Sequence, residues 1–415
     1  MTMKNYILEQ KCRICSSNNL KMILDLGEQP PANSFVDQSE LNSLEHKFPL
    51  RLFWCEDCYL VQLLDIVNKE YLFKNYFYMT SASKPIVEHF QKYAQDIYQE
   101  FLQKENSPFV VEIGSNDGSL LKEFKKLNVQ ILGIEPATNL SDLANQSNIT
   151  TKNTFFSSDL SKEIIKSRNA SIVVANNVIA HVEDLQDLMY GIQILIGNNG
   201  VFVFEVPYLV DLIKNLEFDT IYHEHLSYFS ILPLLKLVKQ FGLEIFDIRK
   251  QSVHGGTLRI FVSKKNNFKI NNSINDFINF ENELGLNTNT IYHEFSLNVM
   301  NLKNQLKELL KKLKQEKKIL FGYGASAKGN VLLNYCDIDN EILDFIIDTT
   351  PTKQNKFTPG THIPIFSPEK IKSKGENVIA LLLAWNYEAQ ILDKEKQFRI
   401  DGGKFLLPIP TPKLI

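Results

Sequence analysis

The sequence contains few cysteines, few tryptophans and no excess of charge of either sign. Its 415 residues include 5 Cys and 2 Trp. So few cysteines cannot form a disulfide framework in a chain of this length. Lys and Arg number 45 against 48 Asp and Glu, which leaves a formal net charge of -3. A phosphate backbone would meet no overall positive charge, so we expect no nucleic-acid partner.

Long apolar runs are also missing. A membrane-spanning helix needs roughly 18 consecutive apolar residues, and residues 1–10 lack the apolar core of a secretion signal. We therefore expect a cytoplasmic protein with no membrane partner. Hydrophobic residues make up 44% and charged residues 22% of the chain, close to the globular average, which excludes a disordered or coiled-coil protein. The length favours two or three domains over one core.

Four of the five cysteines form two Cys-x-x-Cys pairs, Cys12 with Cys15 and Cys55 with Cys58. Each pair offers two thiolates from one tight turn, and two such turns supply the four ligands of a tetrahedral zinc. Redox-active pairs and plain core cysteines are the alternatives, and the insert between the pairs is longer than in a usual zinc ribbon. We predict a structural zinc, because four protein ligands leave no open coordination position.

The middle of the chain has the pattern of a doubly wound α/β sheet. Two late β-rich runs, Leu243–Arg249 and Gly256–Ser263, are joined by residues 250–255, which are too few for a helical crossover, so the runs must pair antiparallel. This ending resembles the class I fold of S-adenosylmethionine-dependent methyltransferases more than a plain dinucleotide-binding fold. The expected parallel strands, separated by helix-compatible stretches, are Phe109–Ile113, Val129–Ile134, Ser171–Asn176 and Val201–Glu205. A helix is expected over Lys84–Gln103.

A second nucleotide-binding type of unit follows nearer the C-terminus. We expect a strand at Lys318–Phe321, a glycine-rich loop at Gly322–Gly329, and further strands at Ile342–Ile347 and Val378–Leu383. Two sheets with glycine-rich crossovers would face one another across a cleft.

The first glycine-rich loop, residues 112–119, follows a buried strand and opens a helix. Gly114 allows a tight turn, Gly118 permits close packing or ligand approach, and Asn116 tolerates a positive φ where a third glycine often lies. Glu135 follows Gly114 by 21 residues, where a carboxylate can accept hydrogen bonds from both hydroxyls of an adenosine ribose. The predicted cofactor-binding residues are Glu112, Gly114, Ser115, Asn116, Gly118, Glu135 and Asn176.

The charge of this loop favours one cofactor over another. Glu112 and Asp117 are negative where the pyrophosphate of NAD would lie, which is unfavourable. A cationic sulfonium ligand with an amino acid tail is attracted by the same charges. We predict S-adenosylmethionine rather than NAD.

Several motifs follow one another along the chain. They are the two cysteine pairs, residues 76–81, the loop at 112–118, Ala180-His181-Val182, residues 221–230, residues 254–259 and the loop at 322–329. Together they resemble the three-domain sugar-nucleotide C-methyltransferases, which methylate carbon 3 of deoxy-4-ketosugars. The resemblance covers nearly the whole chain in the right order, and Phe77 stands where the family suggests a proline. It implies a zinc-binding domain at 1–75, a methyltransferase domain that binds S-adenosylmethionine at 76–285, and a Rossmann-like domain for the nucleotide of the substrate at 286–415.

The segment around residue 222 supplies groups for this chemistry. Methylation at carbon needs a base that removes a proton next to a ketone and a donor that stabilises the enolate oxygen. His225 is the candidate base, because an imidazole titrates near neutrality. Tyr222 and His181 are candidate donors to the keto oxygen, Glu224 either orients His225 or holds a sugar hydroxyl, and Tyr76 closes the pocket. Candidate substrate-binding residues are Tyr208, Gly324, Ser326 and Lys328.

The remaining histidines singled out here are not predicted to take part in catalysis, and neither is a metal ion. His223 is expected to pack or to contact the backbone, and His89 and His362 are left as surface or packing residues. The His-Glu-His run lacks the His-Glu-x-x-His spacing that places two imidazoles on one helical face, so a catalytic metal is disfavoured.

The function predicted from the sequence is transfer of a methyl group from S-adenosylmethionine to carbon 3 of a nucleotide-linked 4-keto-deoxyhexose, by a monomer. The nucleotide, dTDP or GDP, the amino or hydroxyl group at carbon 3 and the product stereochemistry stay open. One alternative is an NAD-dependent sugar-nucleotide oxidoreductase, which two glycine-rich loops also fit. Another is a zinc-containing RNA-binding or scaffold protein.

Overall fold

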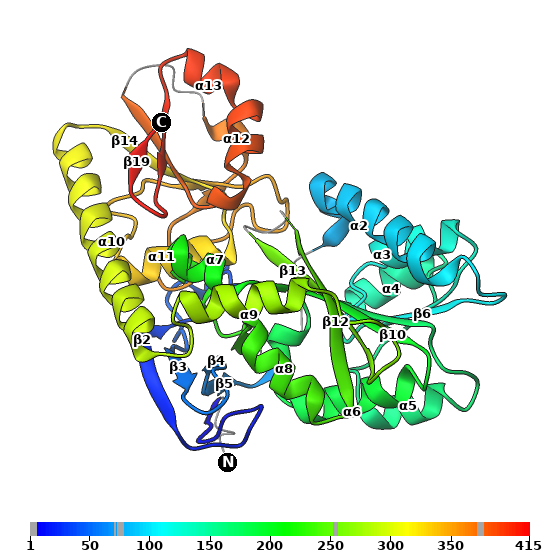
Figure 1. Cartoon of the computed structure of the whole chain (residues 1–415). Helices are drawn as coiled ribbons and strands as arrows, with labels where there is room; N and C mark the ends of the chain where they lie inside the picture. The colour runs from blue at the N-terminus through cyan, green and yellow to red at the C-terminus, as the bar shows by residue number, and fades with distance from the viewer. Residues whose placement is uncertain (1–5, 70–71, 73–78, 252–255, 372–376) are drawn as a thin grey trace.

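The computed structural model describes residues 6–69, 72, 79–251, 256–371 and 377–415. Within these ranges the strands form sheets of two, four, seven and six strands (Figure 1). No helix in the described part of the chain has both the length and the apolar character needed to cross a membrane.

The N-terminal part is built from antiparallel strands. They are β1 (Tyr6–Leu8), β2 (Leu20–Gln29), β3 (Phe48–Cys55), β4 (Val61–Leu63) and β5 (Asp65–Val67). β1 pairs with β5, and the larger sheet has the order β11-β4-β3-β2, in which β11 (Ser227–Tyr228) comes from the middle of the chain. The N-terminal sheet is therefore completed by residues that directly follow His225.

The central sheet contains β6 (Phe109–Ile113), β7 (Gln130–Ile134), β8 (Thr151–Lys152), β9 (Ile172–Asn176), β10 (Val201–Pro207), β12 (Leu243–Gln251) and β13 (Thr257–Lys264). Their order is β12-β13-β10-β9-β6-β7-β8, with β13 antiparallel to both neighbours. Numbered as they occur in the chain, the strands run 3-2-1-4-5-7-6 across the sheet. This is a class I methyltransferase sheet, and the predicted antiparallel hairpin is confirmed.

Helices cover both faces of this sheet (Figure 1). Alternate residues of the central strands pack on opposite faces of the sheet. Val110 belongs to the apolar cluster that includes residues of α2, α3 and α4, whereas Val111 belongs to the cluster that includes residues of α5, α6 and α8. The expected helix at Lys84–Gln103 is α2 followed by a π-helical turn at Tyr98–Leu102. The helices are α2 (Lys84–Ile97), α3 (Ser119–Lys126), α4 (Thr138–Gln146), α5 (Ser158–Ile164), α6 (Leu185–Leu195), α7 (Leu209–Lys214), α8 (Ile231–Lys239) and α9 (Ser273–Glu283).

The C-terminal sheet has the strand order β16-β15-β14-β17-β18-β19, parallel except for β19. Numbered along the chain this is 3-2-1-4-5-6, the order of dinucleotide-binding folds. The strand expected at Ile342–Ile347 is wrong in its first four residues, because only the last two pair with β14. The elements are β14 (Ile319–Tyr323), β15 (Ile346–Ile347), β16 (Ile365–Phe366), β17 (Val378–Leu382), β18 (Lys404–Leu407), β19 (Lys413–Leu414), α11 (Ala327–Tyr335), α12 (Glu388–Lys394) and α13 (Lys396–Ile400).

A long helix, α10 (Asn289–Gln315), runs along one side of the molecule from the N-terminal strands towards the C-terminal sheet (Figure 1). Its buried stripe recurs every three or four residues, as an amphipathic helix requires. Near its start, Tyr292 lies with its ring centroid 5.2 Å from that of Trp54, which stacks on Tyr59 beside the second cysteine pair. The helix thus packs on the cysteine-bearing part.

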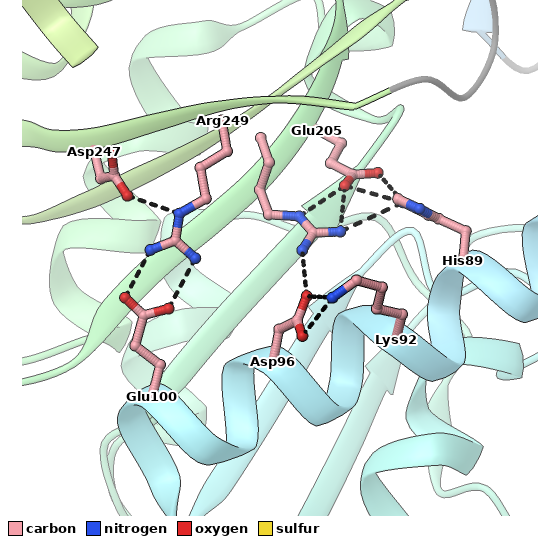
Figure 2. Close-up of polar contacts among 8 residues, drawn as sticks. His89, Lys92, Asp96, Glu100, Glu205, Asp247 and Arg249 are labelled. Carbon is pink, nitrogen blue, oxygen red and sulfur yellow. Dashed lines mark hydrogen bonds and ion pairs between the residues drawn. The ribbon is translucent and has the colours of Figure 1, made fainter.

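Buried charges attach α2 to the antiparallel end of the central sheet (Figure 2). Glu205 and Arg259 lie opposite each other on β10 and β13, with Nη2 of Arg259 2.8 Å from Oε1 of Glu205. His89 on α2 lies 2.9 Å from the other oxygen of Glu205. Burial alone would raise the pKa of Glu205, but the His89 hydrogen bond and the Arg259 charge outweigh it and lower that pKa. His89 is therefore more than a surface or packing residue.

A second ion pair joins the π-helical turn that follows α2 to β12. Arg249 donates to both oxygens of Glu100 at 2.7 and 2.8 Å and, through Nε, to Asp247 at 2.7 Å (Figure 2). The Arg249 side chain is 36% exposed, whereas that of Arg259 is 3% exposed. Water therefore screens the Arg249 pair much more strongly.

This difference in exposure predicts unequal effects of two matched substitutions. Arg259→Met should lower the free energy of unfolding by about 3–5 kcal/mol, because it leaves the buried Glu205 carboxylate with His89 alone. Arg249→Met, the control, should cost no more than about 1 kcal/mol. Urea unfolding followed by circular dichroism measures both values. Similar small losses for the two variants would contradict the account.

Candidate active site

A cavity of about 730 Å³ opens at the carboxyl end of the parallel strands, where α/β sheets bind ligands. It brings together the loop after β6, the segment at 222–228 and the beginning of α11. The predicted site residues that line it are Glu112, Gly114, Ser115, Asn116, Glu135, Asn176, His181, Tyr208, Tyr222, Glu224, His225, Ser326 and Lys328. Gly118 and Gly324 are not among its described lining residues, and Tyr76 lies outside the described residues.

The loop after β6 has the backbone conformation that its sequence predicts. Gly114, Asn116 and Gly118 have φ values of 67°, 50° and 76°. A Cβ atom on Gly114 would clash with Cγ2 of Val178, and one on Gly118 would lie 2.9 Å from Cγ2 of Ile149. Gly118 therefore serves close packing rather than ligand approach.

Glu135 follows β7 and holds this loop in place. Its Oε2 accepts a hydrogen bond from the Asn116 amide at 2.9 Å, and its Oε1 accepts one from the Ala137 amide at 2.8 Å. Burial raises the pKa of Glu135. A carboxylate oxygen can accept two hydrogen bonds, so both oxygens retain capacity for ribose hydroxyls.

Several carboxyl groups lie together at the end of the cavity formed by the loop after β6. Burial, followed by the charges of Asp117 and Glu135, raises the pKa of Glu112 well above its ordinary value. Oε2 of Glu112 and Oγ of Ser115 are buried and have no hydrogen-bond partner among the described residues. Unpaired buried acceptors beside several carboxylates fit a ligand with a positive charge and its own donors. The sulfonium and ammonium groups of S-adenosylmethionine meet this requirement.

Tyr222 and His225 form a hydrogen-bonded pair in the same cavity. Oη of Tyr222 lies 2.8 Å from Nε2 of His225, and Nδ1 of His225 lies 2.9 Å from the carbonyl oxygen of Thr220. A carbonyl oxygen only accepts, so Nδ1 must carry a proton. In the neutral imidazole Nε2 is then the acceptor, and Tyr222 donates to it. Both residues of this pair line the cavity.

His181 and Glu224 lie beside this pair. The ring of His181 is edge-on to that of His225, with centroids 4.7 Å apart. Burial lowers the pKa of His181 to about 4, so its imidazole is neutral at physiological pH. Burial also raises the pKa of Glu224 to about 7, against the hydrogen bond that Nδ2 of Asn33 donates to its Oε1 at 2.7 Å. Glu224 can therefore act either as a hydrogen-bond donor or as an acceptor near neutral pH.

The neighbouring His223 has a structural position. Its Nε2 lies 3.3 Å from the carbonyl oxygens of Phe48 and Pro49, and burial lowers its pKa to about 4. The prediction that it contacts the backbone is confirmed. Tyr208 is also largely committed to the protein, since its hydroxyl donates to Glu281 at 3.0 Å.

The start of α11 closes the cavity from the C-terminal sheet. Oγ of Ser326 accepts a hydrogen bond from the Gly329 amide at 3.0 Å and so caps the helix. The ammonium group of Lys328 lies 4.7 Å from the ring centroid of Trp385. The Trp385 indole donates to Asp219 at 2.6 Å. Lys328 is thus held at the cavity by an aromatic face.

The four paired cysteines converge on one point. Each sulfur lies within 4.8 Å of the others, with 3.3 Å between Sγ of Cys12 and Cys58 and 3.6 Å between Sγ of Cys15 and Cys55. A tetrahedral zinc with Zn–S bonds of about 2.3 Å separates its sulfurs by about 3.8 Å. Small outward shifts bring the thiolates to that geometry, so the set fits a structural zinc.

The site also contains residues that the sequence analysis did not identify. Asn33 contacts Glu224 from 191 positions away, and the Thr220 carbonyl fixes the His225 tautomer. Neither carries a recognisable motif. Outside the cavity, Glu205 did carry a signal, because a lone carboxylate inside the apolar run Val201–Pro207 must have a buried partner.

Comparison with known proteins identifies the family. Three family models match in succession, "Putative zinc binding domain" over residues 12–73, "Methyltransferase domain" over 86–248 and "C-methyltransferase C-terminal domain" over 252–410. A curated relative, C-methyltransferase NovU from Streptomyces niveus, is 33% identical over 407 residues, which cover 98% of this chain and 96% of the relative. The chain belongs to the C-methyltransferase family. It is an S-adenosylmethionine-dependent C-methyltransferase with an N-terminal zinc site, as the fold, acidic loop and cysteine cluster also indicate.

Solved structures that match part of the chain include magnesium protoporphyrin IX methyltransferase from Synechocystis PCC 6803. The match has 13% sequence identity and a TM-score of 0.32, and it covers 44% of this C-methyltransferase and 82% of that chain. An S-adenosylmethionine-dependent methyltransferase from Clostridium acetobutylicum ATCC 824 matches at 13% identity and a TM-score of 0.34, covering 42% and 92%. Both matches are too distant to add anything about the function of this enzyme. The oxidoreductase and RNA-binding alternatives are not supported by the family.

The contacts of Glu135 predict the effect of removing its carboxylate. Glu135→Ala should weaken S-adenosylmethionine binding by about 1.5–3 kcal/mol, because an ionised acceptor is lost from both the loop amides and the ribose hydroxyls. Gly114→Val should weaken binding more, since it clashes at a positive φ. Titration calorimetry measures both. Glu163→Ala, at an exposed carboxylate on α5, is the control, and unchanged affinity in Glu135→Ala would contradict the placement of the cofactor.

Proposed function

We propose that this C-methyltransferase adds a methyl group to carbon 3 of a nucleotide-linked 4-keto-deoxyhexose through an enolate. The observation that carries the proposal is the Tyr222–His225 pair in the same cavity as the acidic cofactor loop. A base and a phenol beside a methyl donor are what methylation next to a ketone needs.

The groups of the cavity have distinct roles in this proposal. Nε2 of His225 removes the proton from carbon 3, while its Nδ1–H group stays hydrogen-bonded to the Thr220 carbonyl oxygen. Oη of Tyr222 turns from His225 to the keto oxygen and stabilises the enolate. The neutral imidazole of His181 supports the same oxygen, Glu224 holds a sugar hydroxyl or orients His225, and Tyr76 closes the pocket. Bound S-adenosylmethionine supplies the electrophilic methyl group.

The nucleotide part of the substrate belongs, in this proposal, to the C-terminal sheet. That sheet has the strand order of nucleotide-binding folds, and Ser326 and Lys328 line the shared cavity at the end of β14. Lys328 is the cation suited to a diphosphate. Gly324, with a φ of 90°, permits the turn before the helix, and Tyr208 shapes the wall of the sugar site.

The residues that line the cavity also bear on the oligomeric state and the domain organisation of the enzyme. Its walls come from the N-terminal, central and C-terminal parts of one chain, which supports a monomer as the working unit. We propose domain bounds of 1–75, 76–285 and 286–415. The pairing of β11 with β4 makes the first two domains structurally dependent on each other.

A panel of nucleotide-linked 4-ketosugars tests the proposed function. The panel varies the nucleotide, dTDP or GDP, and the carbon 3 substituent, amino or hydroxyl. Mass spectrometry should show one product heavier by a methylene unit, formed only with S-adenosylmethionine. A panel without such a product, alongside methylation of a substrate that has no ketone, would overturn the proposal.

A further inference from the structure

Arg13 lies inside the first cysteine pair, but its side chain extends away from the sulfurs. Nη2 donates to the carbonyl oxygen of Leu63 at 3.0 Å, and Nη1 donates to the carbonyl oxygen of Leu226. Nη1 also lies 3.4 Å from Oγ of Ser227. These acceptors end β4 and begin β11, so the guanidinium spans the junction between the N-terminal sheet and the segment that contains His225.

The peptide group at Leu226 is the point where three parts of the molecule meet. Its carbonyl oxygen accepts from Arg13 and, at 3.0 Å, from the amide of Leu63. Its amide donates to the carbonyl oxygen of Ala180 at 2.7 Å. His225 precedes Leu226, and His181 follows Ala180. The two imidazoles, whose ring centroids are 4.7 Å apart, are therefore each one residue from this shared hydrogen bond.

The contacts of Arg13 differ from those of an ordinary ion pair. Its guanidinium donates to two main-chain carbonyls and a serine hydroxyl, whereas Arg51 on β3 donates to both oxygens of Asp65 at 2.6 and 2.9 Å. A guanidinium is a rigid fork with several donors and can hold two carbonyls at once, which a lysine ammonium cannot do with the same geometry. The side chain thus holds two main-chain carbonyls in place through its guanidinium.

We propose that Arg13 is a positioning residue, which ties the cysteine knuckle to the segment at 222–228 and so holds His225 in register with His181. This inference rests on the proposed role of His225. Geometry near a reacting centre is sensitive, since a displacement of about 1 Å can cost about a hundredfold in rate.

The test compares Arg13→Met with Arg51→Met, a matched control on β3 whose guanidinium donates to Asp65 instead of to the 222–228 segment. Both variants should retain zinc and bind S-adenosylmethionine with unchanged affinity. Arg13→Met should lower kcat by about 10- to 100-fold with KM for the ketosugar within about twofold, whereas Arg51→Met should keep kcat within about twofold. Equal kcat in the two variants, or loss of zinc from Arg13→Met alone, would overturn the proposal.

A spectroscopic measurement separates this inference from the proposed function. The imidazole nitrogen signals of His181 and His225, recorded by NMR without substrate, should shift in Arg13→Met and stay in place in Arg51→Met. This outcome does not depend on which substrate the enzyme accepts, and unshifted signals would contradict the positioning role. If Arg13→Met fails to fold, Arg13→Lys provides the same comparison, with a smaller expected shift because one carbonyl keeps its donor.

Discussion

His225→Asn is expected to lower turnover by about 10²- to 10⁴-fold, the usual contribution of a positioned general base. Asparagine keeps a polar group of similar reach but cannot accept a proton at neutral pH. S-adenosylmethionine and the nucleotide sugar should both remain bound, because the acidic loop and the α11 region are unchanged. The same variant should stop exchange of the carbon 3 proton with deuterated solvent, measured by NMR without methyl donor.

Two further variants, a control and a change at the proposed enolate donor, are needed to interpret this result. His293→Asn, at an exposed position of α10, should leave turnover and exchange unchanged. Tyr222→Phe should slow the exchange, because the enolate oxygen loses its donor. Exchange at the wild-type rate in His225→Asn would show that another group is the base. Tyr222 as a phenolate is then the next candidate, since its hydroxyl already lies 2.8 Å from Nε2 of His225, and Glu224 follows it.

Cys55→Ser is expected to unfold the N-terminal part of the enzyme and yield insoluble protein. Binding of structural zinc contributes about 10–16 kcal/mol to the folding of zinc-finger peptides. Cys12, Cys55 and Cys58 lie in the buried core of the N-terminal part, so loss of the metal would leave unpaired thiolates inside that core. Turnover should fall as a consequence, because β11 next to His225 pairs with β4. Metal analysis and limited proteolysis between the N-terminal and central parts measure the effect.

The fifth cysteine offers a matched control for this prediction. Cys336 is buried next to α11 and is not one of the four cysteines whose sulfurs converge. Cys336→Ser should leave the zinc content unchanged. Freshly purified wild-type enzyme without zinc, or a soluble and zinc-loaded Cys55→Ser, would contradict the structural role of the metal.

Structural features that depend on short stretches of sequence were predicted well. The strands β6, β9 and β10 appear as apolar runs bounded by turns, and the antiparallel hairpin follows from the brevity of its connection. The positive φ of Asn116 and the approach of the four cysteines follow from local spacing as well. In each of these cases the deciding interaction lies within a few residues, or a motif of known chemistry supplies the long-range partner.

Interactions between distant residues were not predictable from the sequence. His89 and Glu205 are 116 positions apart, and Arg13 and Leu226 are 213 apart, so no local pattern links them. Helix α7 and a 3-10 turn at Phe218–Thr220 follow β10, and the sequence does not predict them because helices of three to six residues have weak periodicity. The orientation of His225 depends on the Thr220 carbonyl, which the sequence gives no means to place.

The position of the new methyl group tests the account most directly. The enzyme is incubated with a nucleotide-linked 4-keto-deoxyhexose and S-adenosylmethionine that carries a ¹³C-labelled methyl group, and the product is examined by NMR. The account predicts that the label is bonded to carbon 3 of the sugar and that carbon 3 has lost its proton. A label bonded to oxygen, to nitrogen or to another carbon of the sugar would contradict it.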